Sequence, residues 1–247
     1  MTGHLATLVS DPVERERRRK AKREQVLRWL RRNTWSTVEI LREVTGLGSR
    51  QAAHGLLQAM VRDGLVRKSI ISGEFGPSVL VWGITVHGAA MAARQNEPIS
   101  ARTFEPSKIK LATMSHSLDL QRLQLRAERS GWGWEPVSGE FSRSEAKYAD
   151  AVAVRPDGQK VAVEVERTVK TCKRYAEILV AHLAARKEGK WDWVYYLSPE
   201  QGVRDRVERA FHEIRYATWQ QRRMKIDAVH LKPFRFDTYG GGWPEAV

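Results

Sequence analysis

Residues 149–166 read ADAVAVRPDGQKVAVEVE, and this stretch decides the fold of the C-terminal half of the chain. Apolar residues alternate on both sides of RPDGQ, which is the pattern of two half-buried strands. The turn suits a three-residue hairpin loop with Gly158 in the left-handed conformation. Arg155 then pairs with Gln159, so the sequence predicts an antiparallel hairpin of defined register.

Three acidic residues meet in this hairpin. The register places Asp150 opposite Glu164, and strand alternation puts Glu166 on the same face. Like charges this close are costly unless a cation neutralises them, and oxygen ligands suit Mg²⁺ or Mn²⁺. We therefore predict the three acids as metal ligands and catalytic residues, because a metal so held activates water and stabilises charge on a phosphate. Lys170 and Lys173 on the following helix are predicted to add to that stabilisation.

Two questions stay open around these acids. The acids could instead line an exposed strand face and pair with Arg167, Lys147 and Lys160. His116, near the start of the preceding helix, could face the acids or cap its own helix. We expect a structural or hydrogen-bonding role for this histidine.

The segments around the hairpin alternate between helical and strand-like patterns. Helices are predicted over residues 109–130, 169–187 and 199–220, and strands over 134–137, 191–197 and 226–231. This order indicates an α/β fold, a mixed sheet with helices packed on it, spanning residues 109–247.

The N-terminal half shows a different pattern. A first helix with apolar residues at helical spacing starts at residue 25, and two more are predicted over residues 37–44 and 50–63. Strands over 65–71 and 79–84 form a hairpin. Three short helices followed by a hairpin predict a winged helix-turn-helix domain over residues 25–94. The turn LGSR (47–50) and the phrase DGLV (63–66) resemble those of bacterial winged-helix DNA readers.

The third helix of a winged helix lies in the major groove of DNA. Ser49, Arg50, Gln51 and His54 fall on its leading, polar side, so they are predicted to reach phosphates or base edges. Some winged helices bind proteins, and this is the alternative.

The composition supports a polyanionic partner. The chain has 247 residues, a formal net charge of +13 and a pI of about 10.1, and Lys and Arg neutralise phosphates. Residues 1–24 hold a basic charge run, either a solvated helical extension or a DNA-contacting arm. Residues 95–108 are predicted as a linker.

The composition also excludes some classes. The single cysteine, Cys172, excludes internal disulfides and Cys-rich zinc modules. Apolar runs fall short of the roughly 18 residues of a membrane span, and the N-terminus lacks the order of a signal peptide. We therefore expect a cytoplasmic protein.

A helix, a hairpin with these acids, then a helix and a strand resemble the PD-(D/E)xK nuclease superfamily. Asp150 matches the first acid of that motif and Glu164 the second, whereas Glu166 stands where lysine is usual. Some branches supply the lysine from the next helix, so the resemblance implies Lys170 or Lys173 in that role.

A second resemblance covers nearly the whole chain. The segments YADAV (148–152), VEVERT (163–168) and SHSL (115–118), together with the winged helix, resemble the plasmid replication-relaxation family, which includes MobC-type mobilisation relaxases. It implies binding of plasmid origin DNA and metal-dependent nicking of one strand. Relaxosome or conjugation proteins and a second copy of the chain are further candidate partners.

Three functions remain open from the sequence. The leading one is a mobilisation or replication-relaxation protein that binds and nicks DNA. The second is a non-catalytic DNA-binding accessory or regulator whose nuclease-like half is degenerate. The third is a restriction or repair nuclease.

Overall fold

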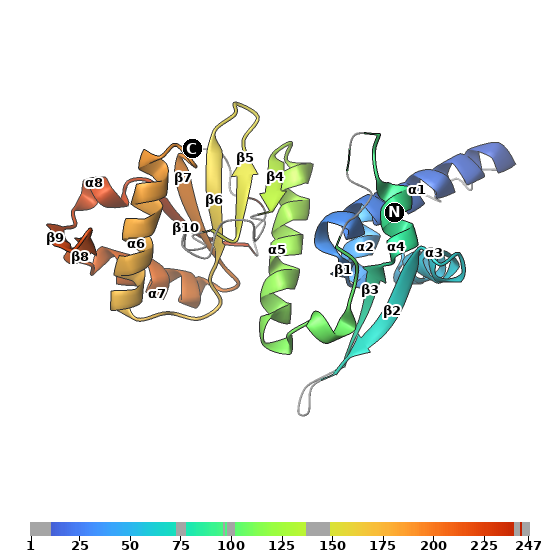
Figure 1. The fold of residues 1–247 in the computed structure, drawn as a ribbon, viewed down its shortest axis with the longest axis horizontal. Coiled ribbons are helices and arrows are strands. Elements are labelled where there is room, and N and C mark those ends of the chain that lie inside the picture. The colour runs from blue at the N-terminus through green and yellow to red at the C-terminus, as the bar shows by residue number, and fades with distance from the viewer. Residues whose placement is uncertain are drawn as a thin grey trace, which may run out of the picture. The chain divides into compact units, whose positions relative to one another are not determined.

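The computed structural model describes residues 11–72, 78–95, 97, 102–136, 149–239 and 243. They form a mixed α/β structure that divides into two compact units, Met1–Ser115 and His116–Val247 (Figure 1). Each unit has a sheet of its own.

The first unit packs helices against a small antiparallel sheet. Its strands are β1 (Trp35–Ser36), β2 (Val66–Ile71) and β3 (Val79–Ile84), in the order β1-β3-β2. Its helices are α1 (Pro12–Asn33), α2 (Val38–Thr45), α3 (Arg50–Arg62), α4 (Val86–Ala92) and the 3₁₀ turn η1 (Pro106–Lys108). α2, α3 and the hairpin start and end at or next to the predicted residues. β1 and α4 were not predicted.

Helix α1 is longer than the sequence pattern indicated. The Asp11 side chain accepts a hydrogen bond from the Val13 backbone N–H at 2.9 Å, and Pro12 occupies the first helical position. Glu14 then pairs with Arg17 and Arg18 at 2.7 and 2.8 Å. The described part of the predicted arm is therefore the first half of the same helix that becomes buried from residue 26.

Helix α3 has a defined start and end. The Ser49 hydroxyl accepts from the Ala52 N–H at 3.1 Å, which caps the helix. Gly64, with φ of 68°, ends it, and the next N–H, of Leu65, donates to Met60 O at 3.0 Å. Between these two ends, Ala53, Leu57 and Met60 share one face of α3 and lie in the core.

Part of the predicted linker packs on the first unit. Phe104 is buried, and its backbone N–H donates to Ile84 O at 3.0 Å. Arg67 donates to the Phe104 carbonyl at 2.6 Å, and its guanidinium lies over the ring. A Cβ at Gly83 would lie 1.9 Å from the Phe104 ring, so this strand position must be glycine for the ring to approach.

The second unit is built on a five-stranded mixed sheet. The order is β10-β7-β6-β5-β4, in which β10, β7 and β6 are parallel and β6, β5 and β4 antiparallel. The strands are β4 (Gly133–Pro136), β5 (Ala151–Val154), β6 (Lys160–Val165), β7 (Trp193–Ser198) and β10 (Phe234–Thr238). The main helices are α5 (Leu111–Arg129), α6 (Cys172–Lys187) and α7 (Gln201–His212).

Helices cover both faces of this sheet (Figure 1). On one face, Leu123 and Ala127 of α5 pack against Val163 of β6 and its neighbours. On the other, α6 and α7 pack against alternate residues such as Ala162 and Tyr196. The hairpin that carries the candidate acids is therefore enclosed between two helical layers.

The register of this hairpin is the predicted one. β5 and β6 pair antiparallel in that register, and the Arg155 N–H donates to Gln159 O at 2.9 Å. Gly158 has φ of 87°, as the turn requires. The register prediction is confirmed for residues 151–154 against 160–163. Asp150, just before β5, donates its backbone N–H to Val163 O at 3.0 Å.

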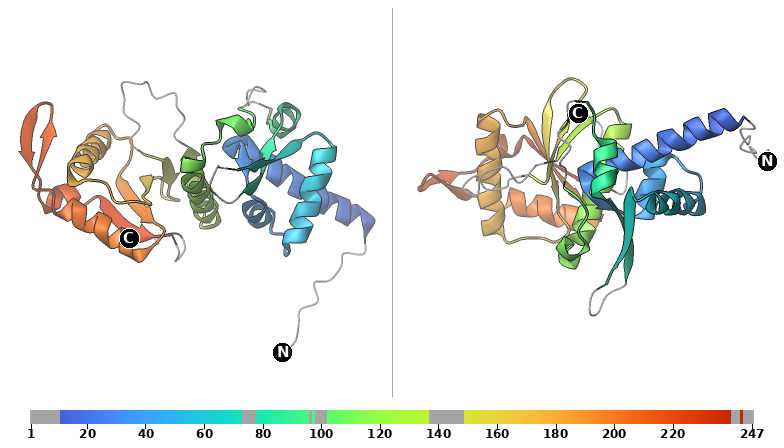
Figure 2. Two further views of the ribbon diagram at one scale, coloured as in Figure 1. Left: turned by 90° about the horizontal axis from the view of Figure 1, so that it is seen from below. Right: turned by 45° about the vertical axis from the view of Figure 1, so that its right-hand side comes forward.

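Two predictions near the C-terminus are wrong. The helix predicted over 199–220 ends at His212, and a hairpin of β8 (Tyr216–Trp219) and β9 (Arg222–Lys225) follows (Figure 2). Its turn residues Gln220 and Gln221 have positive φ, which glutamine does not signal. The strand predicted over 226–231 is largely helix α8 (Ala228–Leu231), because Asp227 caps the N–H groups of Val229 and His230.

We expect Gly88→Ala to destabilise the protein. A Cβ at Gly88 in α4 would lie 2.0 Å from the Leu65 carbonyl oxygen, so the backbone must shift, at about 1–3 kcal/mol. Thermal unfolding should show a lower Tm. Gly55→Ala in α3 is the control: its Cβ meets nothing within 4 Å, and helix propensity favours alanine by about 1 kcal/mol. Equal Tm values for Gly88→Ala and wild type would contradict the packing.

Candidate functional site

The four residues predicted to bind DNA have different environments on α3. Arg50 is 72% exposed, with Nε 2.9 Å from Glu39 Oε1. Gln51 is exposed, and the Ser49 hydroxyl is engaged in the helix cap. His54 is half-buried and packs edge-on against Trp82, with ring centroids 5.5 Å apart. Arg50 and Gln51 are thus the most accessible of the four.

Four residues follow one another along the outer face of α3. Gln51, Gly55, Gln58 and Arg62 are spaced by four, three and four residues, which is one helix face opposite the buried residues. Glutamine pairs with adenine and arginine with guanine in the major groove. We call these four residues the α3 ridge. Sequence reasoning missed Gln58 and Arg62, although the apolar stripe of α3 points away from them.

Asp150 is held at the end of the β5–β6 ladder. Its Oδ2 accepts from the Val165 backbone N–H at 2.9 Å. Continuing the register would pair Val165 with Ala149, so the Asp150 carboxylate replaces a backbone acceptor. Its Oδ1 lies 3.1 Å from His116 Nε2 on α5. His116 therefore faces an acid, in agreement with the expected hydrogen-bonding role.

Glu164 contacts a histidine that the sequence analysis missed. His182 of α6 is fully buried, and its Nε2 lies 3.4 Å from Glu164 Oε1. Burial lowers the pKa of His182 to about 3, although the charge of Asp150 acts in the opposite direction. The imidazole is therefore neutral at pH 7, and the contact is not an ion pair. His182 lies on α6, the helix that follows the strand of Glu164, and the two side chains meet only because this helix packs on the sheet.

Glu166 is paired with one of the two candidate lysines. Its carboxylate is 5% exposed and forms an ion pair with Lys170 Nζ. The Tyr175 hydroxyl donates to Glu166 Oε2 at 3.3 Å and accepts from the Lys170 backbone N–H at 3.0 Å. Burial raises the pKa of Tyr175, so the phenol stays protonated. Lys173 is exposed, and within the described residues no contact joins it to the three acids.

For the alternative pairing with Arg167, Lys147 and Lys160, the described residues place two of the three basic side chains against other acids. Arg167 pairs with Asp119 of α5, and Lys160 lies 3.7 Å from Glu135. Lys147 lies outside the described residues. Among the described side chains, His116 lies next to Asp150, His182 next to Glu164, and Lys170 pairs with Glu166.

The predicted three-acid metal site stays a prediction. Within the part of the chain that the structure describes, no group of three or more His, Cys, Asp or Glu side chains is placed to hold a metal ion. Asp150 and Glu164 are 16% and 19% exposed, so their oxygens remain reachable. Glu166 is closed off by Lys170. Two carboxylates with water and a phosphate still match the way Mg²⁺ is commonly bound.

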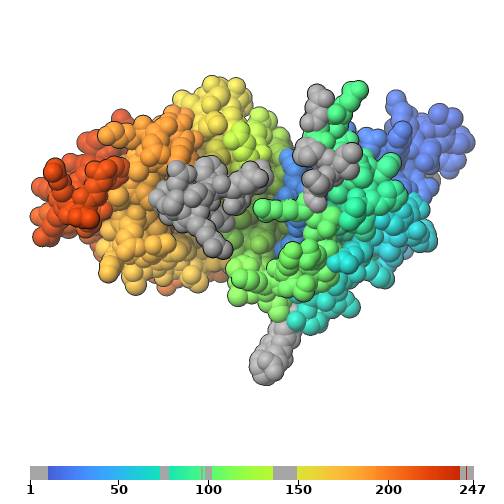
Figure 3. Space-filling model, viewed as in Figure 1, coloured from blue at the N-terminus to red at the C-terminus, as the bar shows by residue number. Residues whose placement is uncertain are grey.

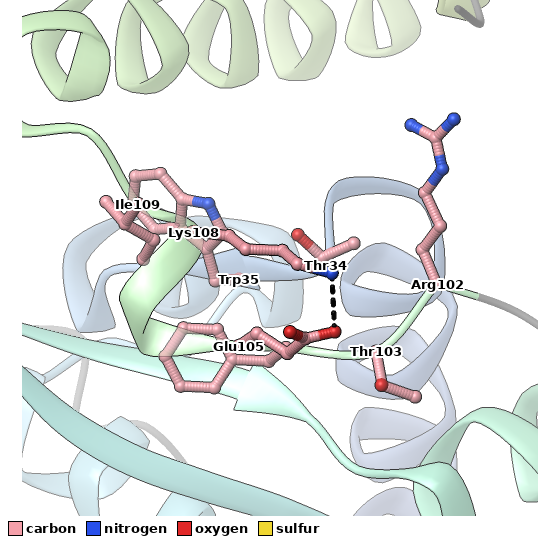
Figure 4. Close-up of a pocket in the computed structure, with 8 residues that line it drawn as sticks. Thr34, Trp35, Arg102, Thr103, Glu105, Lys108 and Ile109 are labelled. Carbon is pink, nitrogen blue, oxygen red and sulfur yellow. Dashed lines mark hydrogen bonds and ion pairs between the residues drawn. The ribbon is translucent and has the colours of Figure 1, made fainter.

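A separate hollow of about 430 Å³ lies in the first unit beside β1 (Figure 4). An ion pair of 2.9 Å joins Glu105 and Lys108 there, and Arg102 extends away from the other side chains drawn. Thr34 at its wall has φ of 64°, unusual for a β-branched residue. The predicted site residues do not line this hollow.

Comparisons of the chain with protein-family models, with curated proteins and with solved structures found no match. The family resemblance seen in the sequence therefore stays a prediction. In the described ranges, every helix is too short or too polar to cross a membrane.

We expect the substitutions His182→Phe and His182→Ala to change the free energy of unfolding by different amounts. Both ring nitrogens lack hydrogen-bond geometry to any described residue, and Trp191 and Phe234 pack against the ring. Phenylalanine should leave the free energy of unfolding within about 1 kcal/mol of wild type, because an unsatisfied buried polar group is removed. Alanine should cost about 3 kcal/mol through the cavity it leaves. Equal losses in urea unfolding would mean that the Glu164 contact itself stabilises the fold.

Proposed function

We propose that the chain binds plasmid DNA and nicks one strand, as a mobilisation or replication-relaxation protein. The order α1-β1-α2-α3-β2-β3, with sheet order β1-β3-β2, supports a winged helix in the first unit. In its α3 ridge, Gln51, Gly55 and Arg62 are exposed and Gln58 is half-buried, and its amide and guanidinium groups can pair with bases. The net charge of +13 favours a polyanion.

The observation that carries the cleavage proposal is the set of polar groups at the end of β5–β6. The order α5-β4-β5-β6-α6-β7 contains the helix, hairpin, helix and strand on which the nuclease resemblance rests. At that end lie Asp150, Glu164 and the Glu166–Lys170 pair. The lysine missing at position 166 is thus supplied by position 170.

Each of these residues has a distinct role in the proposal. Asp150 and Glu164 would hold Mg²⁺ or Mn²⁺, and the metal, when bound, activates water and stabilises charge on the phosphate. Asp150 is oriented by the Val165 N–H and by His116. Glu166 keeps Lys170 at the site, and the Lys170 side chain, 41% exposed, can present its ammonium group to a phosphate oxygen. Lys173 has no role in this arrangement.

We expect metal-dependent nicking that needs Asp150 and Lys170. Purified protein would be mixed with supercoiled plasmid carrying its native origin, with Mg²⁺, Mn²⁺ or EDTA. Open-circle product should form with metal and stop with EDTA. Asp150→Asn should lower the rate at least about 100-fold, and Lys170→Met about 100- to 1000-fold, because each removes charge stabilisation at the transition state.

Lys173→Met is the matched comparison for Lys170→Met, since it removes the same charge three residues away. It should nick at close to the wild-type rate. A large loss in Lys173→Met with none in Lys170→Met would overturn the assignment of the lysine. Linear product from both strands would point to a restriction or repair nuclease.

The second candidate function is a non-catalytic DNA-binding accessory protein. The observation that favours it is that each acid already has a partner and that the described residues hold no three-group metal site. In that case no condition gives nicked plasmid, while gel-shift binding is intact.

We expect Gln51→Ala and Gln58→Ala to weaken sequence-specific DNA binding. Each removes an amide from the α3 ridge, and one base contact contributes about 1–3 kcal/mol, or roughly 5- to 150-fold in affinity. Gel shifts on the origin sequence would measure this. Gln201→Ala, at an exposed position of α7, should leave affinity unchanged. Unchanged affinity in both ridge variants would mean that α3 does not read DNA.

A further inference from the structure

A groove of about 700 Å³ runs between α1 and α3 on the first unit. Figure 3 shows α1 in blue beside the light blue to cyan of α3 on the surface. Small and apolar residues of α3 and of the turn before it form its floor: Leu47, Ala52, Gly55, Leu56 and Ala59. Basic residues form its rim: Arg15, Arg18, Arg19, Lys22 and Arg62.

The charged side chains that line the groove are all basic. The four basic residues of α1 are spaced by three, one and three residues, so they share one face of that helix. Arg18 pairs with Glu14 at 2.8 Å and Arg19 with Glu16 at 3.8 Å. Among the described residues, no acidic side chain lines the groove itself. Its occupant must therefore be anionic.

The position of the groove selects among anionic occupants. Gly55 and Arg62 belong both to the α3 ridge and to the groove, so the groove adjoins the surface that would read bases. A helix in the major groove has a sugar–phosphate strand along each flank. The small side chains of Ala52 and Gly55 leave room for such a strand. An acidic helix from a protein would cover the ridge and exclude DNA.

We infer that the groove between α1 and α3 holds one sugar–phosphate strand of duplex DNA, with α1 as a backbone clamp. This rests on the proposed DNA binding and assigns a role to the basic half of α1. The clamp contributes affinity for any sequence, because phosphates carry no base information.

The test compares two charge-matched triple variants of the full chain. Arg15/Arg19/Lys22→Gln alters the groove face, and Arg17/Lys20/Arg28→Gln alters the opposite face of the same helix. Each removes three positive charges and one arginine that pairs with glutamate. Affinity for a random-sequence duplex would be measured by fluorescence anisotropy at several salt concentrations. Each phosphate contact contributes about 0.9 to the slope of log affinity against log salt.

The groove variant should lower that slope by about 2–3, and the control by less than about 1. Equal losses in both variants would overturn the clamp and leave only bulk charge. An unchanged slope in the groove variant, with binding intact, would also overturn it and assign the groove to an acidic protein helix. A wild-type protein without affinity for DNA even at low salt would instead refute the proposed function itself.

Discussion

The hydrogen bond from the Val165 N–H to the Asp150 carboxylate is the contact on which the rest of the second unit's polar site depends. The turn at Gly158 fixes the β5–β6 register, and a shift by one residue would send Asp150 and Glu164 to opposite faces. In the observed register the ladder ends where Asp150 begins. The Asp150 carboxylate then accepts the hydrogen bond that a backbone carbonyl would otherwise accept. If the carboxylate moved away, the Val165 N–H would lose its hydrogen-bond partner.

Holding acids at the edge of a buried sheet has an electrostatic cost, and side chains from both helical layers contact these acids. His116 comes from α5 and His182 from α6, so Asp150 and Glu164 are each contacted from a different side. Glu166 is the most buried of the three acids of the hairpin, and its partner is the Lys170 ammonium. The site is therefore a product of the three-layer packing as much as of the hairpin.

The hairpin could be predicted because a local turn fixes its register, whereas its partners come from distant segments. The sequence around His182 does not predict its contact with Glu164, because that contact forms only when α6 packs on the sheet. The β8–β9 turn was not predicted because its two residues with positive φ, Gln220 and Gln221, are not glycines. The strand predicted over 226–231 is wrong because Asp227 caps a short helix there, in which Val229 is 76% exposed.

The geometry of Lys170 bears on whether the lysine of the nuclease pattern was relocated or lost. The segment before α6 is not helical, yet it is tied at two points, by the Glu166 ion pair and by the hydrogen bond from Lys170 N to the Tyr175 hydroxyl. Burying both charges of this ion pair would add a desolvation cost. Here the Glu166 side chain is 5% exposed and the Lys170 side chain 41%, so the pair is anchored at its acidic end and open to solvent at its basic end. That arrangement suits an ammonium group that meets an anion arriving from solvent, which favours relocation.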